Sequence, residues 1–424
     1  MTAIEKVNTL RDEIGRALRE QVIPFWLERA VDRGHGGYLT CFDERGRPSG
    51  DTGKYIVTQT RMLWGFMYLS DFGNEKDKAA LAGAARQGMD FFADRFWDSE
   101  HGGFVWKTDR AGHVIDGGKL LYGQSFALYA LAEYHRKTGD GRALSLARET
   151  LSLMLRHAAD TCHGGFYENL EPDWSLSPGG KYAGDRKSLD IHMHIMEALT
   201  TLYAADPSPF NARKLREIAD LIVNRMINRE RGYGYNQFTA DFTRVPAINI
   251  HRTWNAERET GEVVEAPTDT TSYGHNVELS WLLDLALTTL GADKTPYLGV
   301  IRKLLDHSLA HGFDYEYGGL YRDGVADGEA LVRDKEWWQN FEALVGYANG
   351  YLLFHDERYL DALRSTWAFD RDHFMNSEVG ESRQLLDRAG RPLIADLGNP
   401  WKGIYHTGRS HAECAAMLPQ IKER

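Results

Sequence analysis

The sequence predicts an all-α fold, an (α/α)6 barrel of twelve helices with short β-hairpins in the connecting loops. Three observations carry this prediction. A glycine-rich turn recurs along the 424 residues, a pair of segments with helical spacing of apolar residues lies between successive turns, and one helix of each pair is much more apolar than the other. The twelve helices are expected to form a single domain over residues 1–424.

The glycine-rich turn is found six times. Its clearest copies place two glycines before an aromatic residue, as in Gly36-Gly37-Tyr38. Glycine permits positive φ and aromatic residues favour extended chain, so each copy predicts a turn into a short strand. The six copies are found at Gly36, Gly102, Gly164, Gly232, Gly318 and, in a degenerate form, Gly380.

The segments between the turns predict the helices. Every second one is apolar nearly all round, as in 121–131, which is typical of buried helices. The others, such as 140–157 and 209–228, carry a charged stripe that is typical of outer helices. Six buried helices inside six amphipathic ones close into a barrel. In chain order the expected helices are 8–31, 57–72, 76–96, 121–137, 140–157, 188–205, 209–228, 274–291, 295–312, 336–353, 355–375 and 405–421.

Composition and charge exclude several classes of protein. With 42% hydrophobic and 12% aromatic residues, the chain is expected to fold rather than remain disordered. No apolar run is long enough for a membrane helix, the first residues lack a signal-peptide layout, and three scattered cysteines do not make a disulfide framework. A cytoplasmic location is therefore expected. The 50 basic and 61 acidic residues argue against nucleic acid or an anionic membrane as partner, and nothing indicates an oligomeric state.

Polar residues stand at the start of every expected inner helix. Because the inner helices of such a barrel run parallel, their N-terminal ends share one mouth, and these residues predict a pocket there. A single buried histidine is more often structural, but six helices with the same feature favour a functional site. The residues concerned are Arg61, Tyr122, Asp190, His192, His194, His275, Glu278, Trp337, Trp338, Glu342, Trp401, His406 and Arg409.

Two histidines indicate acid–base chemistry at this mouth. His275 and Glu278 share a helical face, so Glu278 is expected to orient and activate His275. His406 comes from another helix, and two imidazoles on different sides of a substrate suit proton removal on one face and delivery on the other. Arg61 with the histidines at 192 and 194 would stabilise an oxyanion. The tryptophans offer platforms for a sugar ring, so a small sugar is the expected partner.

Three motifs resemble the N-acylglucosamine 2-epimerase superfamily and, within it, the cellobiose and mannose 2-epimerase branch. They are Gly274-His275-Asn276-Val277-Glu278, Lys335-Glu336-Trp337-Trp338 and Trp401-Lys402-x-x-Tyr405-His406-x-Gly408-Arg409. The resemblance implies an (α/α)6 barrel without metal ion or organic cofactor. It also implies a mechanism: the aldose ring opens, a base removes the proton from carbon 2, and a cis-enediolate is reprotonated on the opposite face.

The resemblance also implies roles for individual residues. His275 and His406 are similar to the acid–base pair of the family, and Glu278 to the residue that activates His275. Arg61 and His194 resemble the groups that stabilise the enediolate and assist ring opening, while Tyr122, Trp338 and Trp401 resemble positions that contact the substrate. Two departures concern the neighbours of the histidines: Asn276 stands where cellobiose epimerases usually have Asp, and Ile404-Tyr405-His406-Thr407 replaces Pro-Tyr-His-Asn.

One interval of the repeat is irregular. From Gly232 to Gly318 the spacing is 86 residues, whereas the other intervals are 62 to 68. The excess of about 21 residues predicts a long loop at about 240–273, directly before His275, and long loops in compact domains are usually functional. We expect this loop to cap the pocket and to clash with a second sugar unit. The expected reaction is therefore the interconversion of D-mannose and D-glucose.

Several alternatives remain open at this stage. If the loop folds away, the enzyme would be a cellobiose 2-epimerase acting on the reducing-end glucose of β-1,4-disaccharides. Reprotonation at carbon 1 would instead make it a mannose–fructose isomerase. A glycoside hydrolase would need two carboxylates, for which Glu278 with Asp190 or Glu342 could serve. A zinc site of His192, His275 and His406 is the last alternative. The histidine-rich mouth favours an epimerase over the hydrolase and the zinc site.

Overall fold

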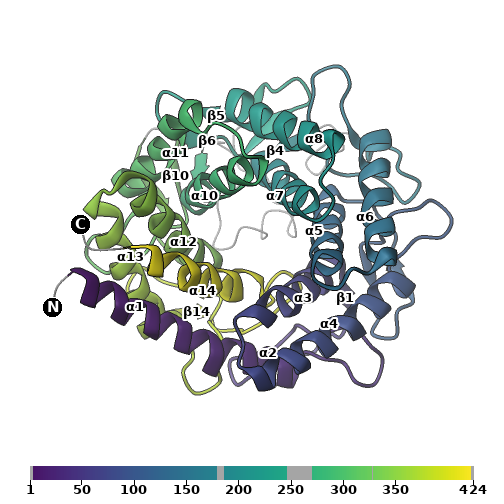
Figure 1. Cartoon of the computed structure of the whole chain (residues 1–424), viewed down its shortest axis with the longest axis horizontal. Helices are drawn as coiled ribbons and strands as arrows, with labels where there is room; N and C mark the ends of the chain where they lie inside the picture. The colour runs from purple at the N-terminus through teal and green to yellow at the C-terminus, as the bar shows by residue number, and fades with distance from the viewer. Residues whose placement is uncertain (1–2, 179–185, 246–269, 327, 422–424) are drawn as a thin grey trace.

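The computed structural model describes residues 3–178, 186–245, 270–326 and 328–421. Within these ranges the helices form two concentric rings around a common axis (Figure 1). The inner ring consists of α3 (Ile56–Tyr68), α5 (Leu121–Thr138), α7 (Leu189–Ala205), α10 (Tyr273–Leu290), α12 (Trp337–Phe354) and α14 (Tyr405–Met417). The outer ring consists of α1 (Ala3–Ala17) with α2 (Ile23–Arg29), α4 (Glu75–Arg95), α6 (Gly141–Leu153), α8 (Pro209–Leu221), α11 (Thr295–His307) and α13 (Glu357–Phe369).

The alternation of outer and inner helices predicted from the sequence is confirmed at all twelve positions. Burial explains the difference between the rings. In α10 nearly every side chain is buried, whereas α11 buries one face through Val300, Ile301, Leu304 and Leu305. The ring closes where α1 packs against α14 (Figure 1).

Five outer helical segments continue into a π-helical turn, which holds one more residue between hydrogen-bonded partners than an α-turn. Four of these turns lead directly into a copy of the glycine-rich turn, and the first joins α1 to α2. The turns are Leu18–Val22, Met154–Ala158, Ile222–Met226, Ser308–Gly312 and Asp370–Phe374. Two inner helices end instead in short 3₁₀ turns, Leu69–Asp71 and Leu418–Gln420.

An Asp or Asn stands four residues before the first glycine of every copy of the turn. In the copy at Gly318, the Asp314 carboxylate accepts hydrogen bonds from the N–H groups of Glu316 and Tyr317, and its carbonyl accepts the N–H of Gly318. The glycine then takes φ of +87°, which a residue with a Cβ rarely adopts. In the degenerate copy Asn376 does the same for Gly380, whose φ is +112°. All six copies are thus confirmed as turns.

Buried lysines hold these turns against the starts of inner helices. Lys335 lies two residues before α12, is fully buried, and pairs with Asp314 at 3.1 Å. Equivalent pairs before α3, α5 and α7 are Lys54–Asp32, Lys119–Asp98 and Lys187–Asp160. Before α10, Thr271 takes the place of the lysine and donates its hydroxyl to Gly234 O. Each tie places the first turn of an inner helix, where the polar residues of the mouth lie.

Short antiparallel sheets cover the same end of the barrel. A strand leading into an inner helix pairs with the hairpin of another connection, as β1 (Lys54–Tyr55) pairs with β2 (Lys107–Thr108). The three-stranded sheets have the orders β1-β2-β3, β4-β7-β8, β11-β10-β9 and β12-β13-β14, and β5 pairs with β6. The remaining strands are β3 (Val114–Asp116), β4 (Arg186–Ser188), β5 (Ile227–Asn228), β6 (Tyr233–Gly234), β7 (Gln237–Thr239), β8 (Arg244–Val245), β9 (Thr270–Ser272), β10 (Asp323–Val325), β11 (Ala330–Val332), β12 (Lys335–Glu336), β13 (Leu385–Leu386) and β14 (Pro392–Ile394).

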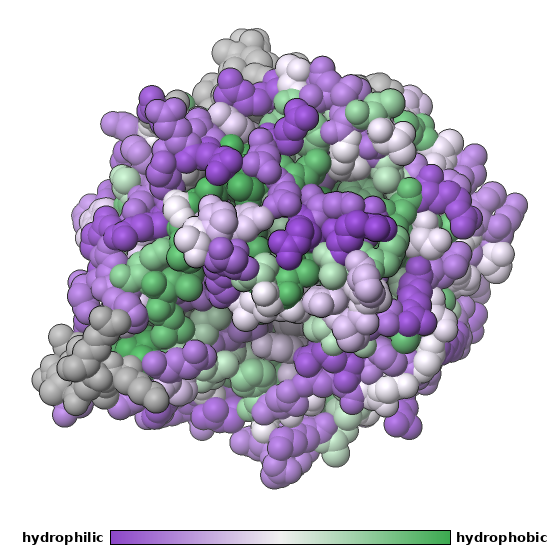
Figure 2. Space-filling model, turned by 45° about the horizontal axis from the view of Figure 1, so that its top comes forward, coloured by the Kyte–Doolittle hydropathy of each residue, from purple (hydrophilic) through white to green (hydrophobic). Residues whose placement is uncertain are grey.

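The surface is polar over most of the face seen in Figure 2, with hydrophobic residues in smaller patches between hydrophilic ones. None of the helices in the described ranges combines the length and apolarity that crossing a bilayer requires.

Two glycines of positive φ provide a test of the turn geometry. Gly103 has φ of +74° and a Cβ on it would lie 2.4 Å from the Trp174 ring, whereas Gly139 has φ of +73° with open space around it. Alanine at either position is strained by about 1–2 kcal/mol, and crowding adds about 1–3 kcal/mol at Gly103 alone. Chemical denaturation should therefore show a larger loss of unfolding free energy for Gly103→Ala than for Gly139→Ala. Equal losses would contradict this account of the turn.

Candidate active site

A pocket of about 360 Å³ lies among the first turns of the inner helices. It receives side chains from all six of them. Each residue that lines it is among those expected at the mouth from the sequence. The lining consists of Arg61, Tyr122, Asp190, His194, His275, Glu278, Trp337, Trp338, Trp401 and His406.

His275 and His406 reach the pocket from different helices. His275 lies in the first turn of α10, where the Ser272 hydroxyl caps the helix by accepting its N–H. His406 lies in the first turn of α14. The Trp338 ring contacts both imidazoles, with ring centroids 4.6 Å from His275 and 5.8 Å from His406. A ligand packed on this indole would therefore meet an imidazole from each of two helices.

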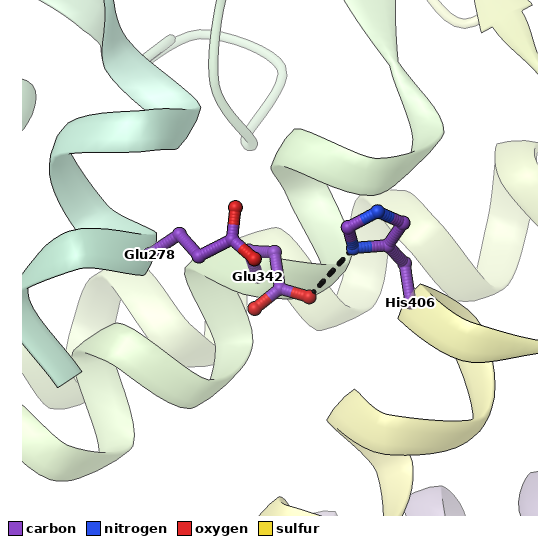
Figure 3. A group of neighbouring side chains, drawn as sticks. All are labelled: Glu278, Glu342 and His406. Atoms are coloured by element: carbon purple, nitrogen blue, oxygen red, sulfur yellow. Dashed lines mark hydrogen bonds and ion pairs between the residues drawn. The ribbon is translucent and has the colours of Figure 1, made fainter. Parts of the chain in front are cut away.

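His406 is set up as a neutral imidazole. Its Nδ1 lies 2.8 Å from Glu342 Oε1, and Figure 3 shows His406, Glu342 and Glu278 pointing toward one another. Burial lowers the pKa of His406 well below its ordinary value, and the positive charges of Arg61 and Arg409 lower it further. With the Nδ1 proton donated to Glu342, Nε2 keeps its lone pair and can accept a proton.

Arg409 ties three carboxylates together beneath the pocket. Its guanidinium donates to Glu342 at 2.6 Å, and to Glu278 and Glu197 in short contacts. The Tyr405 hydroxyl donates to Glu197 as well, at 2.6 Å. Arg409 is 1% exposed, so these charges are compensated inside the protein rather than by water.

Burial raises the pKa of Glu342 to about 8, against the lowering effect of Arg409. The pKa of Glu278 is also raised by burial. The ligand atoms of Glu278, Glu342 and His406 lie close enough together for a cation. Arg409 already contacts both carboxylates of this group, so the positive charge that the group requires comes from the chain itself.

His194 carries carboxylates on both ring nitrogens. Nδ1 lies 2.9 Å from Glu197 Oε2, and Nε2 lies 3.3 Å from Asp190 Oδ1. Burial alone would lower the pKa of His194, but these two partners outweigh it and raise the pKa to about 9. His194 is therefore an imidazolium at neutral pH, and its ring lies 5.3 Å from that of Tyr122.

Arg61 brings a second cation to the same side of the pocket. It donates to the Tyr122 hydroxyl at 2.9 Å and to the carbonyl of Trp401 at 2.8 Å. Two positive groups, Arg61 and His194, thus flank Tyr122. An arrangement of this kind stabilises negative charge that develops on a substrate oxygen.

Three of the expected site residues do not line the pocket. Glu342 and Arg409 lie behind the lining and act on it through His406 and Glu278. The expected role of His192 in substrate binding is wrong. His192 is fully buried, its Nδ1 donates to Ser188 O at 2.8 Å, and its Nε2 accepts the N–H of Phe166 at 3.0 Å. A zinc site of His192, His275 and His406 fails for the same reason.

His192 holds the glycine-rich turn, as polar residues do at the same position of other inner helices. The Gln59 amide accepts the N–H of Tyr38 and donates to its carbonyl, and Gln124 does the same for Phe104. Each of these three residues is the fourth of its helix. Alignment of the repeats at this position would have marked His192 as structural.

Replacement of His192 by glutamine should therefore leave catalysis intact. A glutamine can accept the Phe166 N–H as Gln59 and Gln124 accept theirs, so kcat/KM is expected to stay within about 3-fold of wild type. Steady-state kinetics on the purified variant checks this. A loss of about 10²-fold or more, of the size seen when an acid–base group is removed, would return His192 to the catalytic machinery.

The expected contact between Glu278 and His275 is replaced by other partners that the sequence did not indicate. Glu278 contacts Arg409, and the carboxylate beside His275 is Asp190, with Oδ1 3.6 Å from Nε2. Glu197 was missed entirely. Its position three residues after His194 in an otherwise apolar helix was the available signal, because residues three apart meet on a helix surface.

The long loop expected at about 240–273 is described only at its ends. Residues 244–245 form strand β8, and residues 270–272 form strand β9, which leads into α10. Residues 246–269 lie outside the described ranges, so the expected capping of the pocket stays a prediction.

Known proteins similar to this chain are sugar epimerases. The sequence model of the N-acylglucosamine 2-epimerase (GlcNAc 2-epimerase) family matches residues 37–410. The cellobiose 2-epimerase of Bacteroides fragilis is 28% identical over 410 residues, 94% of this chain and 97% of that protein. The N-acylglucosamine 2-epimerase of Bos taurus is 25% identical over 427 residues, 99% of this chain and 94% of that protein. The structure of cellobiose 2-epimerase from Spirochaeta thermophila matches with a TM-score of 0.86 and 28% identity, covering 99% of both chains.

Proposed function

Because the chain belongs to the N-acylglucosamine 2-epimerase family and is an isomerase-class enzyme, we propose that it interconverts free D-mannose and D-glucose at carbon 2. The observation that carries this proposal is the placement of two imidazoles from different helices in one pocket. His406 has a neighbourhood that favours the neutral ring, and His275 has a carboxylate at 3.6 Å from Nε2. One can remove a proton while the other supplies one.

The reaction follows from this pair. With the aldose ring open, Nε2 of His406 takes the proton from carbon 2, and the electrons of that C–H bond move toward the carbonyl oxygen. Arg61 and His194 stabilise the enediolate oxygen because both are cations in a site of low dielectric. His275 then donates its proton to the other face of carbon 2, and the carbonyl re-forms. The epimer leaves with a hydrogen that came from the enzyme.

The tryptophans supply the binding surface for the sugar. Trp337, Trp338 and Trp401 line the pocket together with Tyr122, and ligand sites typically combine such apolar walls with a few polar groups that fix orientation. Substrate size is argued from the inserted segment before α10, which would clash with a second sugar unit. Mannose and glucose are therefore the proposed pair.

A cellobiose 2-epimerase is the second candidate, because two of the similar proteins carry that name. It shares the same residues and differs in the space beyond the first sugar. A mannose–fructose isomerase would return the proton to carbon 1 instead. The hydrolase alternative is set aside by family membership. In addition, Glu278 and Glu342 share one guanidinium, whereas hydrolysis needs carboxyl groups on either side of a glycosidic bond.

One experiment separates these candidates. The enzyme is incubated in heavy water with mannose, glucose, fructose or cellobiose, and products and labelled carbons are identified by NMR. We expect glucose from mannose, with deuterium at carbon 2, and a higher kcat/KM for mannose than for cellobiose. Fructose as the main product would favour the isomerase, and preference for cellobiose would overturn the proposed substrate. Removal of residues 250–268 should raise activity on cellobiose relative to mannose.

A further inference from the structure

One carboxylate oxygen faces two histidines in the pocket. Asp190 Oδ1 lies 3.3 Å from Nε2 of His194 and 3.6 Å from Nε2 of His275. All three side chains are buried, with exposed fractions of 2% to 4%. His194 is already charged by Glu197 on its other nitrogen, so its positive charge is balanced there. The Asp190 carboxylate is thus available to stabilise a proton on His275.

His406 has a different electrostatic neighbourhood. Its carboxylate partner Glu342 shares the same oxygen with Arg409, at 2.6 Å, and donates none of its charge to His406 alone. Arg61 lies on the pocket side and adds positive charge. A proton on His406 therefore meets two guanidinium groups, whereas a proton on His275 meets a carboxylate.

The two histidines are linked beneath the pocket, but protons cannot pass along that link. The contacts run from His406 through Glu342 to Arg409, then through Glu197 and His194 to Asp190 and His275. A guanidinium keeps its protons in proteins, so Arg409 separates the link into two arms. Each arm sets the proton affinity of its own histidine.

We propose that Asp190 is a positioning residue that keeps the resting proton on His275, so that His406 begins the turnover as the base. This inference rests on the proposed epimerisation at carbon 2 and assigns unequal roles to its two histidines. The charged and titratable groups around His275 are Asp190 and His194 from α7, Glu278 from its own helix, Glu342 from α12, His406 and Arg409 from α14, and Arg61 from α3.

The sign of the expected pH effect follows from these partners. The active enzyme carries one proton on the pair, so kcat/KM falls at low pH when His406 is protonated and at high pH when His275 loses its proton. A carboxylate raises the pKa of a neighbouring imidazole. Its removal therefore lowers the pKa of His275 and moves the alkaline limb of the profile to lower pH.

The test compares pH profiles of kcat/KM for mannose. Asp190→Asn should move the alkaline limb down by about one pH unit and leave the acidic limb in place, and Asp190→Ala provides a second variant without the carboxylate. Glu342→Gln should move the acidic limb instead, because Glu342 contacts His406. The matched control is Asp284→Asn, which alters a buried carboxylate of α10 that pairs with Lys294 at 2.6 Å outside the pocket lining; both limbs should stay where they are in wild type.

The outcomes separate this inference from the proposed function. Wild-type enzyme that places no deuterium at carbon 2 of the sugar would overturn the proposed function itself. If wild type epimerises mannose but the Asp190 variants keep the wild-type alkaline limb, the resting proton is not held by Asp190. A shift of the acidic limb in those variants would likewise overturn the inference.

Discussion

Replacement of His406 by asparagine is expected to lower kcat for epimerisation by about 10²- to 10⁴-fold, the contribution of a positioned acid–base group. Asparagine can still contact Glu342, but it has no ring nitrogen to accept the proton from carbon 2. The interaction is made only during proton transfer, so kcat and kcat/KM should fall together while KM changes little. Single-turnover and steady-state rates on mannose, with deuterium uptake at carbon 2, measure the effect.

His411 provides the matched control for this variant. It lies on the same helix and is also buried, but its Nδ1 bonds to the Thr407 carbonyl at 2.6 Å and it is absent from the pocket lining. His411→Gln should keep kcat within about 3-fold of wild type in the folded enzyme. If the two variants lose activity equally, or if His406→Asn retains wild-type exchange at carbon 2, His406 is not the base.

Replacement of Arg409 by methionine is expected to lower the free energy of unfolding by about 3–5 kcal/mol at neutral pH, because it leaves buried carboxylates without their cation. The loss should grow with pH. Without the guanidinium, the pKa values of Glu278 and Glu342 rise further above those of the unfolded chain, so their ionisation opposes folding once the pH passes the unfolded value of about 4.3. Chemical denaturation at pH 5 and pH 8 measures the difference.

A compensating variant identifies the cause of that loss. In Arg409→Met combined with Glu278→Gln and Glu342→Gln, the uncompensated charges are gone, and most of the lost stability should return while activity stays low. An Arg409→Met protein as stable as wild type at pH 8 would contradict the role of Arg409 as the tie between the three carboxylates.

The helices could be predicted because their signal is local. Apolar spacing within 121–138 or 295–307 reflects which face is buried, and this holds before any partner helix is known. The π-helical turns could not be predicted, since nothing in the local spacing of a segment such as Met154–Ala158 marks the extra residue. The buried lysines were also missed, because a lysine before a helix has no visible partner until the turn that holds its Asp is placed beside it.

The pocket lining was predicted for a similar reason. Polar side chains in the first turn of an apolar helix, such as His275 or Arg61, have few places to point except the shared mouth of the parallel inner helices. The error concerned His192, which lies in the same first turn but points to the turn behind the helix. One residue of difference changes the face of a helix by about 100°, and the sequence does not show which face meets the pocket.

The sequence by itself determined the barrel, the end at which the site lies and the ten side chains that line it, because periodicity and repetition are properties of a single chain segment. Only the tertiary structure decided which charges meet. Glu278 pairs with Arg409 and Asp190 faces His275, although the local spacing favoured Glu278 for His275. Ion pairs across helices depend on distances of a few ångströms between segments far apart in the chain. Spacing along one helix carries no information about those distances.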